Sequence, residues 1–379
     1  MNMGIYIILL IAAAALIIAG TAIWYAFVFE PANFKLSEIT VNIKSGKSNK
    51  KSQSGEIPEE IKSFKSANVI LNPSGKLPYR NCRGTTILQI LHLTDFHLRK
   101  DRNGRKLFSF IKSLWSLKPD LIFLTGDLVE KDAYFDYLIE MLTGLDAKLG
   151  KYAVFGVHDY YHKRPTEFIK NMIKRQKKYM RQNSIELLVE KLEKIGITSL
   201  RNEKVILNLN PQKNSEGTGL NKINKIEIVG VDDAVIERAD TGYAFGGHKG
   251  KSKPFASGSG RASYRQVLKR PSGHIHSLSE SGKLKICITH TPDMDLFVDF
   301  VENKTDIVIS GHTHGGQVRI PAVGALISGA NIPVKYASGL FYFEKFVLYI
   351  SRGLGEGRYS PFRVYCQPEA TLININSVF

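Results

Sequence analysis

The chain has 379 residues, 43% of them hydrophobic, which fits a globular protein of one large or two ordinary domains. Its formal net charge is +17 at pH 7, but the segments 31–85, 161–184 and 245–283 carry this excess, and the remainder is near neutral. A nucleic-acid-binding protein would line its working groove with such charges and interleave them with aromatic side chains, so the distribution argues against a nucleic-acid partner.

The first predicted element is a membrane span in residues 1–30. The stretch Gly4–Phe29 is almost wholly apolar, and no charged side chain precedes Glu30. About 20 apolar residues cross the hydrocarbon core of a bilayer as a helix. A cleaved signal peptide is the alternative, but it has a basic first region and a shorter apolar run. We therefore expect a retained single-pass anchor.

The residues after the span indicate its orientation. Lysines follow it closely, from Lys35 to Lys51, and nothing basic precedes it. The positive-inside rule then places the bulk of the chain on the cytoplasmic face of a bacterial inner membrane. The three cysteines, Cys82, Cys287 and Cys366, do not suggest a disulfide framework, which agrees with a reducing compartment.

Residues 31–84 are expected to be a juxtamembrane segment and linker, because Ser45–Gly55 is rich in serine, lysine and glycine. The globular domain is expected to span 85–379, where strand and helix patterns alternate. Three successive strand–helix units indicate an α/β sheet with its site at the carboxyl edge of the strands. The strands are predicted at Ile87–Leu93, Asp120–Thr125, Tyr152–Phe155, Lys225–Val231, Leu284–Thr289 and Asp306–Ser310, and helices at Arg105–Leu117 and about Tyr134–Leu142.

Carboxylates and histidines follow these strands. They are Asp95, His97, Asp127, His158, Asp159, His290, His312 and His314. Carboxylate oxygen combined with imidazole nitrogen suits Mn²⁺, Fe or Zn²⁺, whereas an all-oxygen site would suit Mg²⁺ or Ca²⁺. The set exceeds what one ion needs, and a carboxylate shared by two ions ~3.5–4 Å apart supports in-line attack on phosphorus.

These motifs resemble the calcineurin-like metallophosphoesterases, over about residues 85–379 less two insertions. The resemblance extends to Thr289–Asp293, Tyr349–Gly355 and Pro368–Glu369. It implies a four-layer α-β-β-α sandwich of two mixed sheets flanked by helices, here preceded by one transmembrane helix. The tail pattern resembles the membrane-associated branch of the family, and most of all the chlamydial-type pyrophosphatases that act on UDP-2,3-diacylglucosamine.

The resemblance also implies a role for each candidate residue. One divalent ion, most simply Mn²⁺ with Fe, Zn²⁺ or Mg²⁺ as alternatives, would be held by Asp95, His97 and His314. A second would be held by His290 and His312, with Asp127 bridging the two. His158 would act as general acid at the scissile phosphate, and Asp159 would orient it.

The chain departs from the family pattern at Val157, where the family has an asparagine whose amide binds the second metal. A valine side chain has no ligand atom, so the second metal site is expected to be weakened. His162 is the nearest candidate for a replacement ligand.

Two insertions interrupt the domain. Wound as a helix, 161–184 places its apolar side chains within an arc of about 140° and its basic side chains on the rest. This profile is typical of a helix on an anionic membrane surface, the alternative being a helix packed on its own domain with a solvated basic face. The stretch 246–283 is rich in glycine, serine and lysine and is predicted to be a mobile loop.

The resulting hypothesis is a membrane-anchored phosphoesterase that splits the pyrophosphate of an acylated, nucleotide-linked precursor. The resemblance implies UDP-2,3-diacylglucosamine as substrate, and UMP and a lipid monophosphate as products, in lipid A synthesis. One alternative is a broad-specificity phosphodiesterase of the cell envelope, outside the cytoplasmic membrane. The other is a catalytically lapsed, lipid-binding scaffold, for which Val157 is the argument and the remaining site residues are the counterargument.

Overall fold

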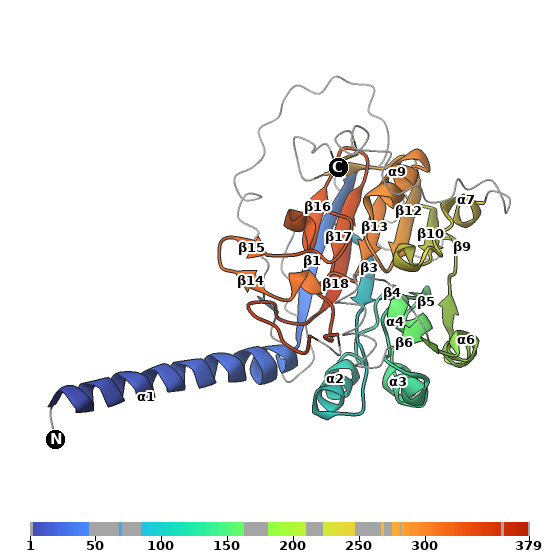
Figure 1. Ribbon diagram of the computed structural model, residues 1–379. Coiled ribbons are helices and arrows are strands. Elements are labelled where there is room, and N and C mark those ends of the chain that lie inside the picture. Colours follow the sequence, from blue (N-terminus) through green and yellow to red (C-terminus); the bar gives the residue numbers. More distant parts are fainter. Residues whose placement is uncertain are drawn as a thin grey trace, which may run out of the picture.

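A computed structural model gives the arrangement of the chain (Figure 1). It describes residues 3–44, 68–69, 85–162, 181–209, 223–246, 267–268, 275–280, 282–357 and 360–377. The predicted basic helix of 161–184 falls mainly on 163–180, and the predicted loop of 246–283 mainly on 247–266 and 269–274, so both lie outside the described residues.

The first sheet has the strand order β11-β1-β18-β3-β4-β5-β8, with β2 paired to β1. Strands β3, β4, β5 and β8 run parallel, β18 runs antiparallel to β3, and β1 runs parallel to β18. The strands are β1 (Lys35–Lys44), β2 (Asn68–Val69), β3 (Thr85–Leu93), β4 (Leu121–Thr125), β5 (Gly150–Val154), β8 (Ile197–Ser199), β11 (His276–Ser277) and β18 (Glu369–Ser377).

The second sheet has the order β16-β17-β13-β12-β10-β9, parallel at its centre and antiparallel at its two outer pairs. Its strands are β9 (Glu203–Asn208), β10 (Lys225–Val231), β12 (Lys283–Thr289), β13 (Ile307–Ser310), β16 (Gly339–Tyr342) and β17 (Val347–Ile350). Two short pairs lie outside the sheets, β6 (Tyr161–His162) with β7 (Arg181–Gln182) and β14 (Arg319–Ile320) with β15 (Gly324–Ala325).

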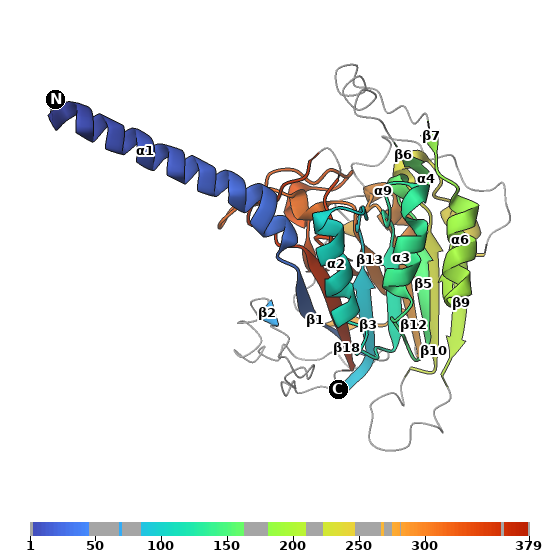
Figure 2. The same ribbon diagram turned by 90° about the horizontal axis from the view of Figure 1, so that it is seen from below.

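Helices cover the outer face of each sheet (Figure 2). They are α2 (Arg102–Ser113), α3 (Phe135–Leu142), α4 (Val157–Tyr160), α6 (Ile185–Lys194), α7 (Thr241–Ala244) and α9 (Met294–Glu302). Short 3-10 turns occur at η2 (Glu30–Ala32), η4 (Asp132–Tyr134), η7 (Ala234–Ile236), η8 (His314–Gly316) and η9 (Val334–Tyr336). Helix α2 begins where the Asp101 side chain accepts a hydrogen bond of 2.8 Å from the Gly104 N–H.

The apolar side chains form three buried layers. One lies between the sheets, where Ile90 and Phe123 of the first meet Ile286 and Ile309 of the second. Another lies between the first sheet and α2, α3 and α6, and the third between the second sheet and α9. Both sheets are thus buried on two faces, which explains why their parallel strands read as continuous apolar runs. The predicted four-layer α/β sandwich is confirmed.

The N-terminal helix projects away from the sandwich (Figures 1 and 2). It comprises α1 (Met3–Trp24), continues through a π-helical turn, η1 (Tyr25–Phe29), and ends in η2. Within Met3–Ala32 an 18-residue stretch has a mean hydropathy of 2.6, and the helix is long and apolar enough to cross a membrane, as a signal sequence at this place would also be. The domain end of this helix contacts a loop near the C-terminus, since Ala26 O accepts a hydrogen bond of 2.9 Å from the Arg363 N–H.

Strand β1 corrects the expected boundary of the globular domain. Residues 31–84 were expected to form a juxtamembrane segment and linker outside the globular domain, yet β1 pairs in parallel with β18 from Lys35↔Glu369 to Ile43↔Ser377. Val41 and Ile43 of this strand are buried between the sheets. The described part of the sandwich therefore begins at Lys35, immediately after the N-terminal helix.

Candidate metal centre

The candidate ligands gather where the carboxyl ends of parallel strands from both sheets meet. Asp95 and His97 follow β3, Asp127 follows β4, His290 follows β12, and His312 and His314 follow β13. Strands β3 and β4 are neighbours in the first sheet, and β12 and β13 are neighbours in the second. Packing the sheets face to face therefore brings six side chains from four loops together.

The backbone of these loops is sharply turned. Most non-glycine residues avoid positive φ, yet five of the six candidate ligands adopt it. The values are 53° at Asp95, 43° at His97, 50° at Asp127, 69° at His312 and 48° at His314. Left-handed residues of this kind persist where the surrounding structure holds them, and they concentrate at functional sites.

Two glycines let the backbone approach the carboxylates. A Cβ on Gly156 would lie 2.3 Å from Oδ1 of Asp127, and one on Gly311 would lie 2.4 Å from Oδ2 of Asp95. Neither contact is possible for a real side chain, so both positions require glycine. Gly156 and Gly311 therefore leave the space that the carboxylates of Asp127 and Asp95 occupy.

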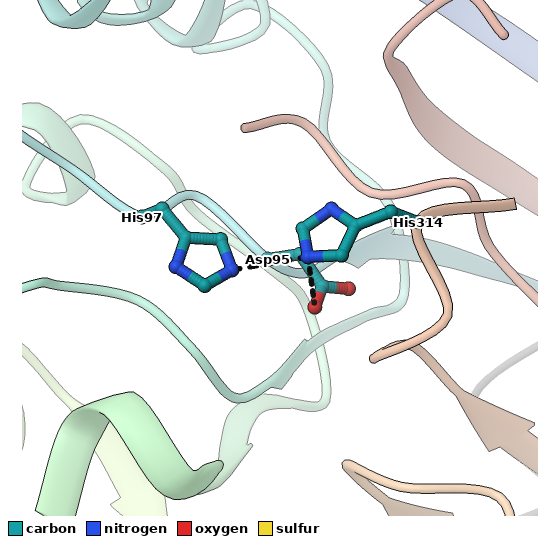
Figure 3. A group of neighbouring side chains, drawn as sticks. All are labelled: Asp95, His97 and His314. Carbon is teal, nitrogen blue, oxygen red and sulfur yellow. Dashed lines mark hydrogen bonds and ion pairs between the residues drawn. The ribbon is translucent and has the colours of Figure 1, made fainter. Parts of the chain in front are cut away.

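One group of possible ligands consists of Asp95, His97 and His314 (Figure 3). Nε2 of His97 lies 3.1 Å from Nε2 of His314, which in turn lies 3.7 Å from Oδ1 of Asp95. All three ligand atoms fall within 4.8 Å of one another. The three side chains can hold one cation.

A second group consists of Asp127, His290 and His312. Nε2 of His290 lies 3.2 Å from Oδ2 of Asp127 and 3.2 Å from Nδ1 of His312. The same oxygen of Asp127 lies 3.6 Å from Nε2 of His97 in the first group. The Asp127 carboxylate is thus placed between the two groups, as a bridging ligand requires.

Hydrogen bonds on the far nitrogen fix the orientation of each imidazole ring. The partners are Glu130 Oε1 for Nδ1 of His97 (2.8 Å), Thr125 O for Nδ1 of His290 (2.7 Å), Gly329 O for Nε2 of His312 (3.3 Å) and Gly355 O for Nδ1 of His314 (3.0 Å). Each far nitrogen donates, so the near nitrogen of the neutral ring presents a lone pair to the site. Two lone pairs 3.1–3.2 Å apart repel unless a cation lies between them, so these residues fit bound metal ions.

The charges around Asp127 favour a cation at this position. Burial raises its pKa, but the neighbouring His290 and His158 lower it further, and the net pKa is well below the usual range. For His290, burial lowers the pKa, and the Asp127 carboxylate outweighs this and raises it well above the usual range. Burial and the adjacent His290 lower the pKa of His312. Within the pair of His290 and His312, one positive charge is thus stabilised beside Asp127, and a second is not.

His158 lies at the edge of the site, with its side chain 28% exposed. Its N–H donates a hydrogen bond of 2.8 Å to Oδ1 of Asp127, and its ring belongs to a third group with His97 and Asp127. Burial lowers its pKa, but the Asp127 and Glu130 carboxylates raise it to about 9. At neutral pH the ring is protonated and can donate a proton to a bound substrate.

Asp159 does not orient His158 as expected. Its carboxylate accepts hydrogen bonds from the N–H groups of Leu128 (2.8 Å), Val129 (3.3 Å) and Gly156 (2.9 Å). Within the described part of the chain, no hydrogen bond joins this carboxylate to the His158 ring. Asp159 therefore connects the loops after β4 and β5, and the group that faces the ring is Glu130.

Glu130 is a site residue that the sequence reasoning missed. Its Oε2 lies 3.7 Å from Nδ1 of His158, while its Oε1 holds His97. Burial raises its pKa, but the two histidines lower it further, so the carboxylate is charged. The available signal was its place three residues after Asp127, on the same loop.

Val157 is buried in the first position of α4, between Gly156 and His158, which both adjoin Asp127. Its side chain offers no ligand atom. His162, the expected replacement, is not brought to the site: its Nδ1 lies 2.7 Å from Oδ1 of Asn183, and it joins none of the metal-binding groups found among the described residues.

A second missed residue is Arg363, whose side chain is fully buried behind the first group. Its Nη2 lies 3.4 Å from Nδ1 of His314 and donates to Arg352 O at 3.0 Å. Burial, then His97 and Arg363, hold the pKa of His314 well below its usual range, which keeps the ring neutral for metal binding. No sequence motif marks Arg363.

Comparisons with known proteins agree with this geometry. Residues 88–316 match the family described as calcineurin-like phosphoesterase. The chain is 26% identical to the uncharacterized metallophosphoesterase YkuE of Bacillus subtilis, over 76% of this chain and 79% of that protein. It is 25% identical to the phosphodiesterase YaeI of Escherichia coli (76% and 82%) and 24% identical to the UDP-2,3-diacylglucosamine pyrophosphatase LpxG of Chlamydia muridarum (76% and 83%).

Proposed function

We propose that this chain, which belongs to the calcineurin-like phosphoesterase family, hydrolyses the pyrophosphate of a nucleotide-linked lipid at a membrane surface. The proposed substrate is UDP-2,3-diacylglucosamine. The observation that carries the proposal is the pair of histidine couples, His97 with His314 and His290 with His312, whose near nitrogens face each other on either side of Asp127.

The first divalent ion is assigned to Asp95, His97 and His314, the second to His290 and His312, and Asp127 is assigned to both. Mn²⁺ is the first candidate, because the donors are mixed nitrogen and oxygen. Two bound cations would neutralise phosphate charge and lower the pKa of an attacking water.

The protein side chains then have three tasks. Asp127 would hold both ions through one carboxylate. The protonated His158 donates to the phosphate oxygen that leaves, and Glu130 keeps that ring protonated and holds His97. Water adds to one phosphorus, the P–O bond to the bridging oxygen breaks, and the products are UMP and a lipid monophosphate.

Two observations support a lipid substrate. The N-terminal helix is long and apolar enough to serve as a membrane anchor. Its end is also joined to the site, because the Arg363 N–H binds Ala26 O while the Arg363 side chain contacts His314. An enzyme anchored through its active-site wall is suited to substrates that stay in the bilayer. The similarity to the chlamydial pyrophosphatase supports the same choice.

The test is incubation of the purified full-length protein and Mn²⁺ with UDP-2,3-diacylglucosamine in mixed vesicles, and separately with a soluble aryl phosphodiester. Asp127→Ala is the matched inactive control. UMP release from the first substrate alone supports the proposal. Release of the aryl product alone selects a broad phosphodiesterase, the alternative favoured by the similarity to the Escherichia coli protein. If neither substrate is hydrolysed at saturating metal, the lipid-binding scaffold is the remaining alternative.

A further inference from the structure

We propose that residues 320–334 form a second lipid-contacting surface, which rests on the same bilayer as the N-terminal helix and borders the metal centre. This segment, the apolar hairpin, runs from Ile320 in β14 through β15 to Val334 at the start of η9. The inference rests on the proposed anchoring by α1 and not on the identity of the substrate.

The composition of the apolar hairpin is unusual for a surface loop. It contains no charged side chain over 15 residues, and it is bounded by Arg319 and Lys335. Exposed connections in soluble proteins are normally rich in charged and polar residues, because water must solvate them. An uncharged, exposed segment therefore needs another environment on its outer side.

Exposed apolar side chains are concentrated in the apolar hairpin. Val323 is 72% exposed, Ile327 64% and Leu326 52%, and Ile320 and Val334 are also exposed. Among the described residues beyond the N-terminal helix, the other exposed large apolar side chains are spread singly over the chain, at Leu187, Ile206, Tyr243, Ile275 and Tyr365. Isolated exposed residues are ordinary, whereas a cluster marks an interaction surface.

The position of the apolar hairpin identifies the partner as lipid. Figure 1 shows β14 and β15 on the side of the sandwich from which α1 projects. The base of the helix on this side carries aromatic rings, with Tyr25 6.0 Å from Tyr365 and Phe27 5.4 Å from Phe362 between ring centroids. Aromatic rings of this kind mark the interface of a bilayer, and a helix inserted there carries the neighbouring apolar surface to the same interface.

The apolar hairpin is also attached directly to the metal centre. Gly329 O accepts the hydrogen bond from Nε2 of His312. The backbone at Ile327 also packs closely against Gly316, because a Cβ added to Gly316 would lie only 2.5 Å from Ile327 O. Gly316 belongs to η8, which contains His314. Contact of the hairpin with lipid would hold the metal centre at the level of the headgroups, where the phosphates of membrane amphiphiles lie.

The test uses the full-length protein in vesicles of phosphatidylcholine and phosphatidylglycerol that contain a quencher-bearing lipid. Cys82 is replaced by serine, Cys287 and Cys366 are buried, and single cysteines are introduced for an environment-sensitive fluorophore. Val323→Cys and Leu326→Cys report on the hairpin. Ile206→Cys in β9, an exposed apolar position at the far edge of the second sheet, is the matched control, and Ala13→Cys reports on α1.

The lipid quencher is expected to reduce the emission at positions 323 and 326 about twofold or more relative to position 206. Quenching at 13 with none at 323 and 326 would overturn the inference and leave the anchor intact. Absence of quenching at all positions would overturn both. A blue shift at 323 that lipid quenchers do not affect would mean that protein, such as a second copy of the chain, covers the hairpin, and would also overturn the inference.

Discussion

Glu130 and His97 form a hydrogen bond of 2.8 Å between a carboxylate oxygen and Nδ1, behind the first group of candidate metal ligands. The bond fixes Nε2 as the nitrogen that faces the site. The other oxygen of the same carboxylate lies 3.7 Å from the His158 ring. One buried acid thus orients a candidate metal ligand and raises the pKa of the proposed general acid.

The first prediction separates these two effects. Glu130→Gln keeps an acceptor for His97 but removes the charge that raises the pKa of His158, so the alkaline limb of the kcat/KM profile should move to lower pH. Glu130→Ala also frees His97 and should lower metal affinity by ~10–100-fold. The measurements are the pH profile of kcat/KM and the metal titration of both variants. An unshifted alkaline limb in Glu130→Gln would exclude an effect of the Glu130 charge on the pKa of His158.

Asp127→Ala should be the most damaging change of a single metal ligand. It removes the shared oxygen ligand and leaves two cations facing each other, so activity should fall by at least ~100-fold. Asp146→Ala is the control, because this exposed carboxylate pairs with Lys118 away from the site and should leave activity intact. Wild-type activity of Asp127→Ala at saturating Mn²⁺ would contradict the assignment of the bridge.

The third prediction concerns Val157, which replaces an amide ligand of the family. Val157→Asn should lower the metal concentration for half-maximal activity, by ~10-fold or more if the amide reaches the second ion. Val157→Ala provides the control, since it shortens the same side chain without adding a ligand. If the asparagine and alanine variants titrate alike, position 157 is not a ligand position.

A fourth prediction is a pH dependence of stability that arises at His92. Burial lowers its pKa from 6.5 to about 3, while its Nε2 is 2.7 Å from Oγ1 of Thr125. Between these pH values the unfolded chain binds a proton that the folded chain does not, so stability falls as pH falls, by about 1.4 kcal/mol per unit. His92→Gln retains a polar partner for Thr125 and should lose this dependence.

The measurement for His92 is urea unfolding of the detergent-solubilised protein at several pH values between 4 and 8. The wild type and His92→Gln share every other titrating group, so the difference between their free energies of unfolding isolates His92. That difference should shift in favour of the variant below about pH 6.5. A pH-independent difference would mean that the pKa of His92 is the same in the folded protein as in the unfolded chain, and would contradict the prediction.

The topology predicted from the lysines after the span provides the fifth test. Alkaline phosphatase fused at the C-terminus should be inactive, and a reporter that works only in the cytoplasm should be active. The opposite pattern would place the domain outside the cytoplasmic membrane and favour the broad phosphodiesterase.

The sequence predicted the parts of the fold that depend on local pattern. Strand β10 was predicted at Lys225–Val231 and occurs there, and the other parallel strands agree to within a few residues. Such strands are buried on both faces, so their apolar runs are conspicuous. The role of Lys35–Lys44 was not predictable in this way, because its partner β18 lies over 300 residues away and its own sequence mixes polar and apolar residues.

The candidate ligands were accessible to sequence reasoning for a related reason. They follow directly on buried strands, and the ends of parallel strands meet at one edge. The supporting residues lack this mark. Arg363 reaches His314 from an irregular loop, and Asp159 was assigned to the wrong partner because proximity in sequence to His158 does not specify where a carboxylate points.

The entry of the chain into the first sheet limits how the enzyme can find its substrate. Only Asn33 and Phe34 separate the end of the N-terminal helix from β1, and β1 is paired along its length with β18. With α1 as the proposed membrane anchor, this short connection would fix the domain in height and tilt, whereas a domain on a long tether would sample a larger volume. Encounters with the proposed bilayer substrate would then depend on lateral diffusion in two dimensions, and substrates in a facing membrane would be out of reach. A water-soluble form made by truncation has to begin before Lys35, since a later start removes a strand of the core.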